Sequence, residues 1–304
     1  MSKANATAAV ARPNKKRFKI YPYLFIAPTF ILIFIFSYYA MFDAVVTSFK
    51  DSKIGFEGVF NGFDNYVRLF QNGVFWISFK NQVVLTVMSV VNSIFWPLLA
   101  AELLFFIRHK KLANVVKTAF VIPMLVPGIV TTLTWRFLFN NDFGFNTILE
   151  EIGLGSLKHN WLNDESIALW CLIFIGFPFV SGLYFLIFHA GINNIGQELY
   201  EAAIIDGATS WQVAWRIHIP NVMPYVNVIA TLSLIGSLSG FGLVAATTGG
   251  GPGNATMIPA MLMYKVAFGD GNFGYASAMG VVIMVIIMLL TLVTRKLFAS
   301  KGAD

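Results

Sequence analysis

The chain has 304 residues, of which 57% are hydrophobic and only 12% are charged, and its net charge is +6. Soluble domains are about 25% charged and less apolar, so a water-soluble globule is excluded. Uncharged apolar segments of about 20 residues, the length that crosses a bilayer as a helix, recur along the whole chain. The sequence therefore predicts a protein that spans the membrane several times.

Six apolar segments are predicted to form membrane helices when they are read against turn and charge signals. They are residues 21–42, 81–106, 118–139, 167–190, 222–246 and 275–293. Basic residues precede the first segment, as in a secretory signal, but it is long and no small-residue cleavage site follows, so we expect a retained helix. The predicted fold is an all-α membrane domain over residues 21–298, between a basic amino-terminal segment, residues 1–20, and a tail, residues 299–304.

The positions of lysine and arginine predict the orientation of this domain. Six spans put both termini on one side of the membrane, and that side carries 14 of the 21 basic residues. These are Lys3, Arg12, Lys15, Lys16, Arg17, Lys19, Arg108, Lys110, Lys111, Lys117, Arg216, Arg295, Lys296 and Lys301. The positive-inside rule therefore predicts that both termini are cytoplasmic. Because topology explains the basic charge, the expected surroundings are membrane lipid, and nucleic-acid binding is not expected.

Ionisable and metal-binding side chains are scarce inside the predicted spans. Glu102 and Arg136 lie near helix ends without an opposite charge at the same depth, so both are expected to extend to the membrane surface. His189 is likewise expected at the interface, and the single cysteine, Cys171, excludes a disulfide framework. An ion-coupled carrier or an intramembrane enzyme needs clusters of such residues. Both classes of protein are therefore disfavoured.

The predicted cytoplasmic segment of residues 191–221 is acidic, although the positive-inside rule favours basic residues there. Its charged residues are Glu198, Glu201, Asp206 and Arg216. Residues 197–205 are predicted to form a helix that stops at Gly207, because glycine tolerates positive φ. A Thr-x-x-Gln capping box that begins at Thr209 predicts a second short helix, which Pro220 terminates.

Two interpretations of this helix, turn and helix unit remain open. An amphipathic pair lying on the bilayer would carry exposed apolar residues, but anionic lipid would repel its negative charge. A docking element for a soluble partner is favoured, because Ala202 and Ala203 permit close approach and Glu201 offers an anchoring charge.

Seven residues of this unit form a recognisable pattern. They are Glu201, Ala202, Ala203, Asp206, Gly207, Ile217 and Pro220. Their order and spacing resemble the EAA motif of the inner-membrane permeases of binding-protein-dependent ABC importers, within the carbohydrate-uptake group of maltose and glycerol-phosphate permeases. Ile219 departs from the leucine that is usual there, which is a conservative change. Further similar stretches occur in order at residues 64–66, 69–70, 123–127, 135–140 and 249–252.

The resemblance implies a type I ABC importer-like permease, which is a passive pore subunit. In this family two permeases, usually related but distinct, form the pore. Two ATPase subunits dock on the EAA segments, and an extracytoplasmic binding protein delivers the solute. ATP and magnesium would bind the ATPase, so no cofactor, metal site or catalytic residue is expected here, and the sequence has no Gly-Lys dipeptide for a P-loop. The implied roles are a charged contact for Glu201, close packing for Ala202 and Ala203, and a turn for Gly207.

The predicted fifth helix carries serines and glycines on one face. Ser233 and Ser237 are four residues apart and lie beside Gly236. Small residues of this kind serve helix packing in bilayers, but hydroxyl groups near the midplane also suit a sugar site. The resemblance to maltose permeases, which hold sugar with this helix, favours the second role. The implied substrate-path residues are Met124, Gly176, Phe177, Ser233, Ser237 and Gly240.

The predicted function is import of a sugar or oligosaccharide by a permease in the cell membrane, with energy from a separate ATPase. The alternatives are a permease of the same type for another solute, such as glycerol phosphate, and a stand-alone secondary carrier. Residues 249–254 (GGGPGN) are predicted to form an outer loop. The resemblance implies that this loop approaches the binding protein or caps the pore from outside, and a plain connection between two spans is the alternative.

Overall fold

The computed structural model describes residues 21–56 and 58–299. The predicted basic segment, residues 1–20, and residues 300–304 of the predicted tail lie outside this part of the chain. The chain divides into two compact units, residues 1–43 and residues 44–304. The first unit holds α1 (Tyr21–Ile33), the π-helical turn η1 (Phe34–Tyr38) and the start of α2 (Tyr39–Thr47).

The second unit is helical apart from one small antiparallel hairpin, in which Lys50 pairs with Phe60. Its elements in chain order are β1 (Lys50–Asp51), β2 (Val59–Phe60), α3 (Asp64–Gln71), α4 (Gly73–Phe105), α5 (Lys110–Val121), η2 (Ile122–Leu125), α6 (Gly128–Leu138), α7 (Phe145–Glu151), η3 (Gly155–Leu157), α8 (Ala168–Phe174), α9 (Gly182–Asn193), α10 (Gln197–Ile205), α11 (Ser210–Val213), η4 (Ala214–His218), α12 (Ile219–Ser239), α13 (Gly242–Ala246), α14 (Pro259–Tyr264), η5 (Lys265–Gly269) and α15 (Phe273–Ala299). The prediction of a helical fold is confirmed.

Within the described residues, four helical stretches are long and apolar enough to cross a bilayer. They are Tyr23–Thr47, Gly73–Phe105, Ser210–Ser239 and Phe273–Val293. The pair Lys110–Leu125 and Gly128–Leu138 would supply a fifth span if it crosses as one bent unit, and Gly182–Asn193 is a shorter apolar helix. The prediction of several spans is confirmed, but the third and fourth predicted helices are broken rather than continuous.

Prolines and a glycine mark the positions where the predicted helices break. The third predicted helix bends by 92° between η2 and α6, where Pro123 lies in η2 and Pro127 precedes α6. Proline has no N–H to donate and disfavours a helical conformation in the residue before it. The fourth is interrupted between α8 and α9, around Pro178. The fifth ends with α12, because Gly240 adopts an extended conformation.

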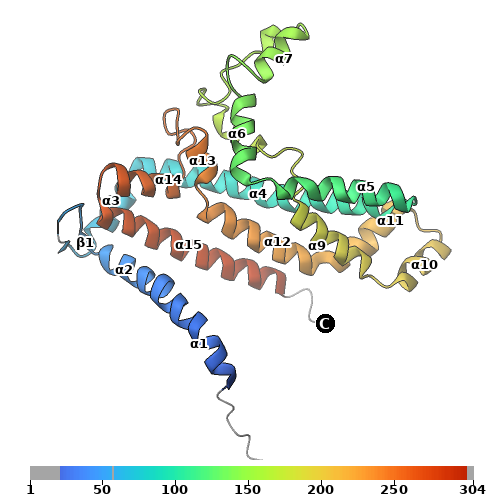
Figure 1. Cartoon of the computed structure of the whole chain (residues 1–304), viewed down its shortest axis with the longest axis horizontal. Coiled ribbons are helices and arrows are strands. Elements are labelled where there is room, and N and C mark those ends of the chain that lie inside the picture. The colour runs from blue at the N-terminus through green and yellow to red at the C-terminus, as the bar shows by residue number, and fades with distance from the viewer. Residues whose placement is uncertain (1–20, 57, 300–304) are drawn as a thin grey trace, which may run out of the picture. The chain divides into compact units, whose positions relative to one another are not determined.

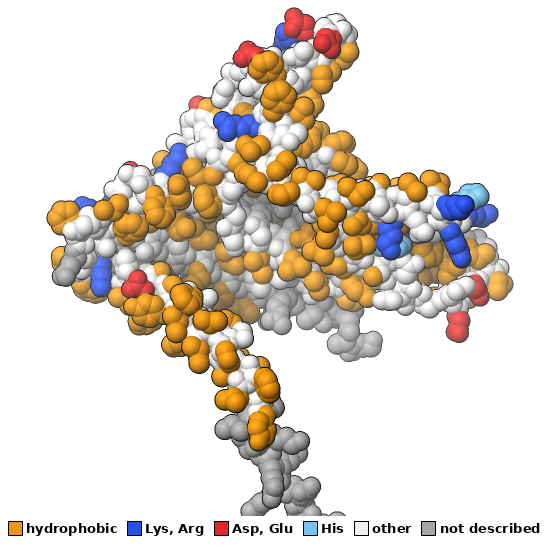
Figure 2. All heavy atoms as spheres, in the orientation of Figure 1, with side chains coloured by type: hydrophobic (Ala, Val, Ile, Leu, Met, Phe, Trp, Pro, Cys, Tyr) orange, Lys and Arg blue, Asp and Glu red, His pale blue; other side chains and the backbone are white. Residues whose placement is uncertain are grey.

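The helix α4 is central to the second unit. It packs against α9 and α12, and α15 lies along α12 (Figure 1). Buried side chains that include Ala101, Phe188 and Ile229 join α4, α9 and α12, and a second apolar cluster includes Leu69 and Met279. Hydrophobic side chains cover much of the visible helix surface, whereas many charged side chains gather toward the ends of helices (Figure 2). This distribution suits a surface that faces lipid.

The segment between α6 and α8, residues 139–167, is polar, and side-chain hydrogen bonds hold it in place. Asn146 Nδ2 donates to the carbonyl oxygens of Asn141 and His159, at 3.0 and 2.9 Å. Asp164 accepts hydrogen bonds from the hydroxyl and backbone N–H of Ser166, and these bonds, with a contact to His159, lower its pKa to about 2. The Asp164 carboxylate is therefore charged at physiological pH.

Asn81 on α4 holds the chain that follows α13, since its Nδ2 donates to the carbonyl oxygens of Asn254 and Met257 at 3.1 and 3.0 Å. Replacement Asn81→Leu leaves both carbonyls without this donor and should cost about 1–3 kcal/mol. We expect faster amide hydrogen exchange at residues 249–258 in this variant. Lys80→Leu changes an exposed neighbour and is the control. Equal exchange rates in the two variants would show that Asn81 does not hold this part of the chain.

Candidate functional site

A cavity of about 510 Å³ lies in the second unit, between α4, α8, α12 and α13. Small-molecule sites commonly have volumes of about 300–1,000 Å³, so this one is large enough to hold a ligand. Its lining residues are Gln82, Leu85, Met88, Ser89, Asn92, Ser93, Leu172, Ile173, Ile175, Gly176, Phe179, Val180, Ser181, Gly236, Ser237, Gly240, Gly242, Leu243, Val244 and Ile258. The lining combines apolar side chains with hydroxyl and amide groups.

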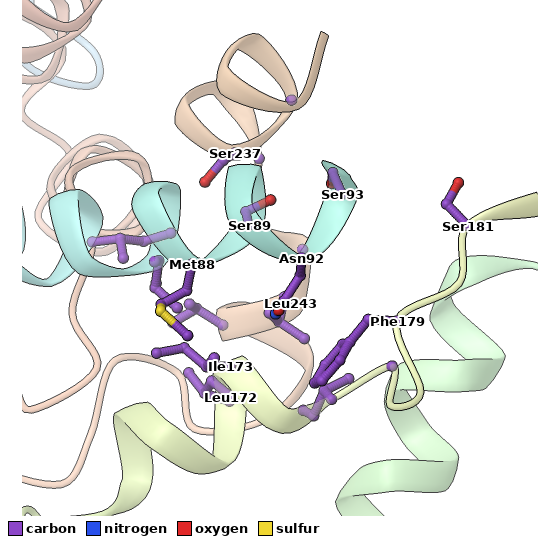
Figure 3. A pocket seen from close by; sticks show the side chains of 18 of the residues that line it. Met88, Ser89, Asn92, Ser93, Leu172, Ile173, Phe179, Ser181, Ser237 and Leu243 are labelled. Carbon is purple, nitrogen blue, oxygen red and sulfur yellow. The ribbon is translucent and has the colours of Figure 1, made fainter. Parts of the chain in front are cut away.

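The polar groups of the cavity come mainly from α4. Figure 3 shows Asn92 projecting from α4, and Phe179 from the irregular chain between α8 and α9, toward the same space. Ser89 and Ser237 add hydroxyl groups from α4 and α12. Among the residues that the structure describes, no charged side chain lines the cavity. Such a site could hydrogen-bond a neutral, polyhydroxylated ligand and offer an aromatic ring to its apolar face.

Hydrogen bonds between α4 and α12 close one wall of the cavity. Gln82 Nε2 donates to the carbonyl oxygen of Ser237 at 3.1 Å, and Thr86 Oγ1 lies 3.0 Å from Ser237 Oγ. Farther along α4, Ser93 Oγ accepts a hydrogen bond from Ser233 Oγ at 3.0 Å. Gln82, Thr86 and Ser233 are buried. Most of these polar groups have hydrogen-bond partners inside the protein, as an apolar surrounding requires, but Gln82 Oε1 is buried without one among the described residues.

The predicted substrate-path residues divide into two groups. Gly176, Ser237 and Gly240 line the cavity, but Met124, Phe177 and Ser233 are not among its lining residues. Met124 lies in η2 with half of its surface exposed. The ring of Phe177 stacks on Phe174, at 5.1 Å between ring centroids. Ser233 instead binds the serines of α4.

The α4 side chains of the cavity were missed in the sequence, although a signal was present. Polar residues recur in this apolar helix at Gln82, Thr86, Ser89 and Ser93. Their spacing of three or four residues puts them on one face. Such a polar stripe inside a membrane helix is typical of a helix contact or a polar path.

The predicted helix, turn and helix unit is present. α10 has the predicted bounds, Gln197–Ile205, and Gly207 follows in a left-handed conformation with φ of +77°. The capping box is also confirmed, because Thr209 Oγ1 accepts from the N–H of Gln212 while Gln212 Oε1 accepts from the N–H of Thr209.

The prediction that Pro220 terminates the second helix is wrong. Residues Ser210–Ser239 form one continuous helical stretch that includes α11, η4 and α12. Pro220 is the second residue of α12 and follows the π-helical turn η4. Proline is tolerated near the start of an α-helix, and the wider π turn before it changes the hydrogen-bonding pattern at this point. Ile217 lies in η4 and is partly buried.

The surface of α10 exposes apolar and acidic residues together. Ile205 is 85% exposed and Ile204 is 47% exposed. Glu201 and Ala202 are also exposed, whereas Ala203 is partly buried. Asp206 and Gly207 at the end of the helix are exposed as well. Gln197 Nε2 donates to Glu201 Oε1 at 2.8 Å, which orients the carboxylate along the helix.

Glu102 does not extend to the membrane surface as predicted. Its Oε2 lies 2.9 Å from Nδ1 of His218, and both side chains are buried, with 10% and 1% of their surface exposed. The two residues are 116 positions apart in the sequence, so no local sequence pattern indicates this contact. Arg136 is exposed and donates to the carbonyl oxygen of Ala246.

These contacts tie α4 to the continuous helix of η4 and α12 at three levels. We call them the polar seam, which consists of Gln82 and Thr86 with Ser237, Ser93 with Ser233, and Glu102 with His218.

A protein-family model described as binding-protein-dependent transport system inner membrane component matches residues 93–301. The probable ABC transporter permease protein YurN of Bacillus subtilis is 34% identical over 284 residues, which cover 93% of this chain and 97% of that protein. The arabinooligosaccharides transport system permease protein AraP of the same organism is 30% identical, and the match covers 93% of this chain and 90% of AraP.

The fold is also found in solved structures. A bacterial alginate ABC transporter, crystallised in complex with an alginate pentasaccharide-bound periplasmic protein, contains a chain that superposes with a TM-score of 0.81. The two chains are 23% identical, and the match covers 91% of this chain and 93% of the other. At this identity the likeness concerns the fold.

The capping box should stabilise the start of α11. Thr209→Ala removes the hydroxyl that accepts from the N–H of Gln212 and should cost about 1 kcal/mol of local stability. Hydrogen exchange at residues 210–213 should be faster in this variant. Thr209→Ser keeps the hydroxyl and should exchange like the native protein. If Thr209→Ser exchanges as fast as Thr209→Ala, the cap does not stabilise this helix.

Proposed function

We infer that this chain, which belongs to the binding-protein-dependent transport system inner membrane components, imports a sugar or oligosaccharide across the inner membrane. As a member of this family it is the non-catalytic permease of an ABC transporter that works with a binding protein. The carbohydrate assignment rests chiefly on one observation, which is the uncharged cavity lined by hydroxyl, amide and aromatic groups.

The chemistry of the cavity suits a carbohydrate better than a charged solute. A sugar presents apolar ring faces and hydroxyl edges, which Phe179 on one wall and Asn92 and Ser89 on another could meet. A phosphate ester would need cationic donors, and the described part of the chain places none in the cavity lining. The relationship to AraP, whose name assigns it arabinooligosaccharides, supports the same solute class.

The proposed transporter contains further subunits. A second permease, a related chain rather than a copy of this one, would complete the pore. Two ATPase subunits would bind ATP and magnesium, and an extracytoplasmic binding protein would deliver the sugar. The bound periplasmic protein in the alginate transporter supports the last of these partners.

We place the ATPase contact on α10. Its exposed Ile204 and Ile205 supply apolar area, while Glu201 and Asp206 supply negative charge at the same surface. A patch that combines an apolar anchor with a charged rim is typical of a protein interface. The small Ala202 is exposed beside Glu201 and would permit close approach.

Ile205→Asp tests this contact. Removal of a central apolar anchor costs about 2 kcal/mol or more, so we expect the ATPase subunits to bind the permease at least about 30-fold more weakly. The measurement is the affinity of purified ATPase for permease in nanodiscs. Ile152→Asp is a matched control, because Ile152 is 61% exposed in the segment between α6 and α8. The predicted topology puts this segment on the side of the membrane opposite to α10. Equal affinity for both variants would place the contact elsewhere.

Ser237→Leu and Asn92→Leu test the substrate path. Each puts an apolar branched side chain where the cavity has a polar group, and we expect uptake of the transported sugar to fall at least about tenfold. The sugar is first identified from a panel of labelled di- and oligosaccharides. Asn92 is outside the polar seam, so its variant separates loss of the path from loss of helix packing.

Ser239→Leu is the control for both variants, because Ser239 is exposed on α12 and does not line the cavity. Basal ATP hydrolysis by the assembled transporter should be unchanged in all three. Normal uptake by both Ser237→Leu and Asn92→Leu would remove the cavity from the path.

A further inference from the structure

The polar seam runs along α4 and the continuous η4–α12 helix in one register. Residue numbers rise along α4 from Gln82 to Glu102 while their partners fall from Ser237 to His218. The two helices are therefore antiparallel, and the seam extends from the cavity to the end of α4. The contact between Glu102 and His218 is its level farthest along α4.

This last level of the seam is connected to α10 by aromatic rings. The ring of Phe105, at the end of α4, lies 4.6 Å from the ring of His218 and 5.3 Å from the ring of Tyr200. Tyr200 belongs to α10, directly before Glu201. Side-chain contacts thus run from α10 through Phe105 to His218, and from there along the seam to the cavity.

The buried contact between Glu102 and His218 is not the arrangement that would stabilise the protein most. Glu102 Oε1 is buried and has no hydrogen-bond partner among the described residues. A buried polar pair with an unsatisfied oxygen often stabilises a protein less than apolar side chains of similar volume would. A bond of 2.9 Å between Glu102 and His218 nevertheless has a narrow geometry, whereas an apolar contact lets helices slide.

The backbone around His218 also indicates that this residue helps to position the helices. His218 is the last residue of η4, a π-helical turn. π turns inside helices occur often at functional sites, because they change the direction of the side chains that follow. This turn lies between the α10–α11 unit and α12.

We propose that Glu102 and His218 are positioning residues that lock α4 and α12 into one lever. When a partner displaces α10, the lock makes both helices move together and so moves the wall of the cavity. Without it, the helices slip past each other at this end and the displacement does not reach the cavity. The inference rests on the proposed docking role of α10, but not on the identity of the solute.

The test uses the complete transporter in lipid nanodiscs, with Cys171→Ala as the background. Nitroxide labels on Ser239→Cys and Trp170→Cys, both exposed, report the distance between α12 and α8 by double electron–electron resonance. Magnesium ATP with vanadate is the probe, because it acts on the ATPase without a sugar. With Glu102 and His218 intact, we expect the probe to shift this distance.

The decisive variant combines Glu102→Leu with His218→Phe. It should insert, because apolar replacement of a buried pair is often neutral. It should keep its ATPase subunits and their basal hydrolysis rate, yet lose the shift. The exchange of Glu102→His with His218→Glu restores a polar contact and should recover the shift. His189→Phe removes a histidine outside the seam and is the matched control, which should keep it.

A shift that persists in the apolar double variant, or that an inserted exchange variant does not recover, overturns the proposal. If the double variant does not insert, Glu102→Met is compared with Glu102→Gln, of which only the second keeps an acceptor for His218. Equal shifts in these two overturn it as well. An intact transporter that does not respond to the probe overturns the lever, while the carbohydrate assignment still depends on the uptake measurements.

Discussion

The helix arrangement of this permease depends on hydrogen bonds between helices, because the hydrophobic effect does not drive helix association inside a bilayer. Lipid tails are as apolar as leucine, so packing and polar contacts hold membrane helices together. The polar seam supplies such contacts between α4 and the continuous η4–α12 helix at three levels. Because each of these hydrogen bonds needs a narrow range of distances and angles, the seam fixes the register of the two helices and with it one wall of the cavity.

The opposite wall depends on irregular backbone. The chain between α8 and α9 leaves the helical conformation around Pro178, and residues on both sides of that proline line the cavity. Non-helical backbone at membrane depth is tolerated only where it is buried or borders an aqueous cavity. The residues that break the predicted helices therefore also shape the site. A bundle of strictly regular helices would have left less room for a cavity of about 510 Å³.

The cavity and the proposed docking surface on α10 lie at different levels of one helix pair. The cavity opens where α4 carries Ser89 and Asn92, and the α10 surface lies near the end of α4, where Phe105 contacts Tyr200. A rigid connection between them would let a passive pore use energy released on another subunit. Packed helices transmit displacement well, because protein interiors are dense and move between discrete arrangements.

The sequence by itself determined the features that depend on local chemistry. The apolar segments identified the membrane class, and the turn at Gly207 and the cap at Thr209 formed as predicted, because a few neighbouring residues decide them. The lining of the cavity was anticipated in part, since Ser237 lies in it as well as Asn92, which was not singled out from the sequence. The pairing of Glu102 with His218 was decided by the tertiary structure alone. The polar stripe of α4 marks a face that makes a helix contact, but it does not say which helix meets that face or in what register. Packing between distant segments decides both.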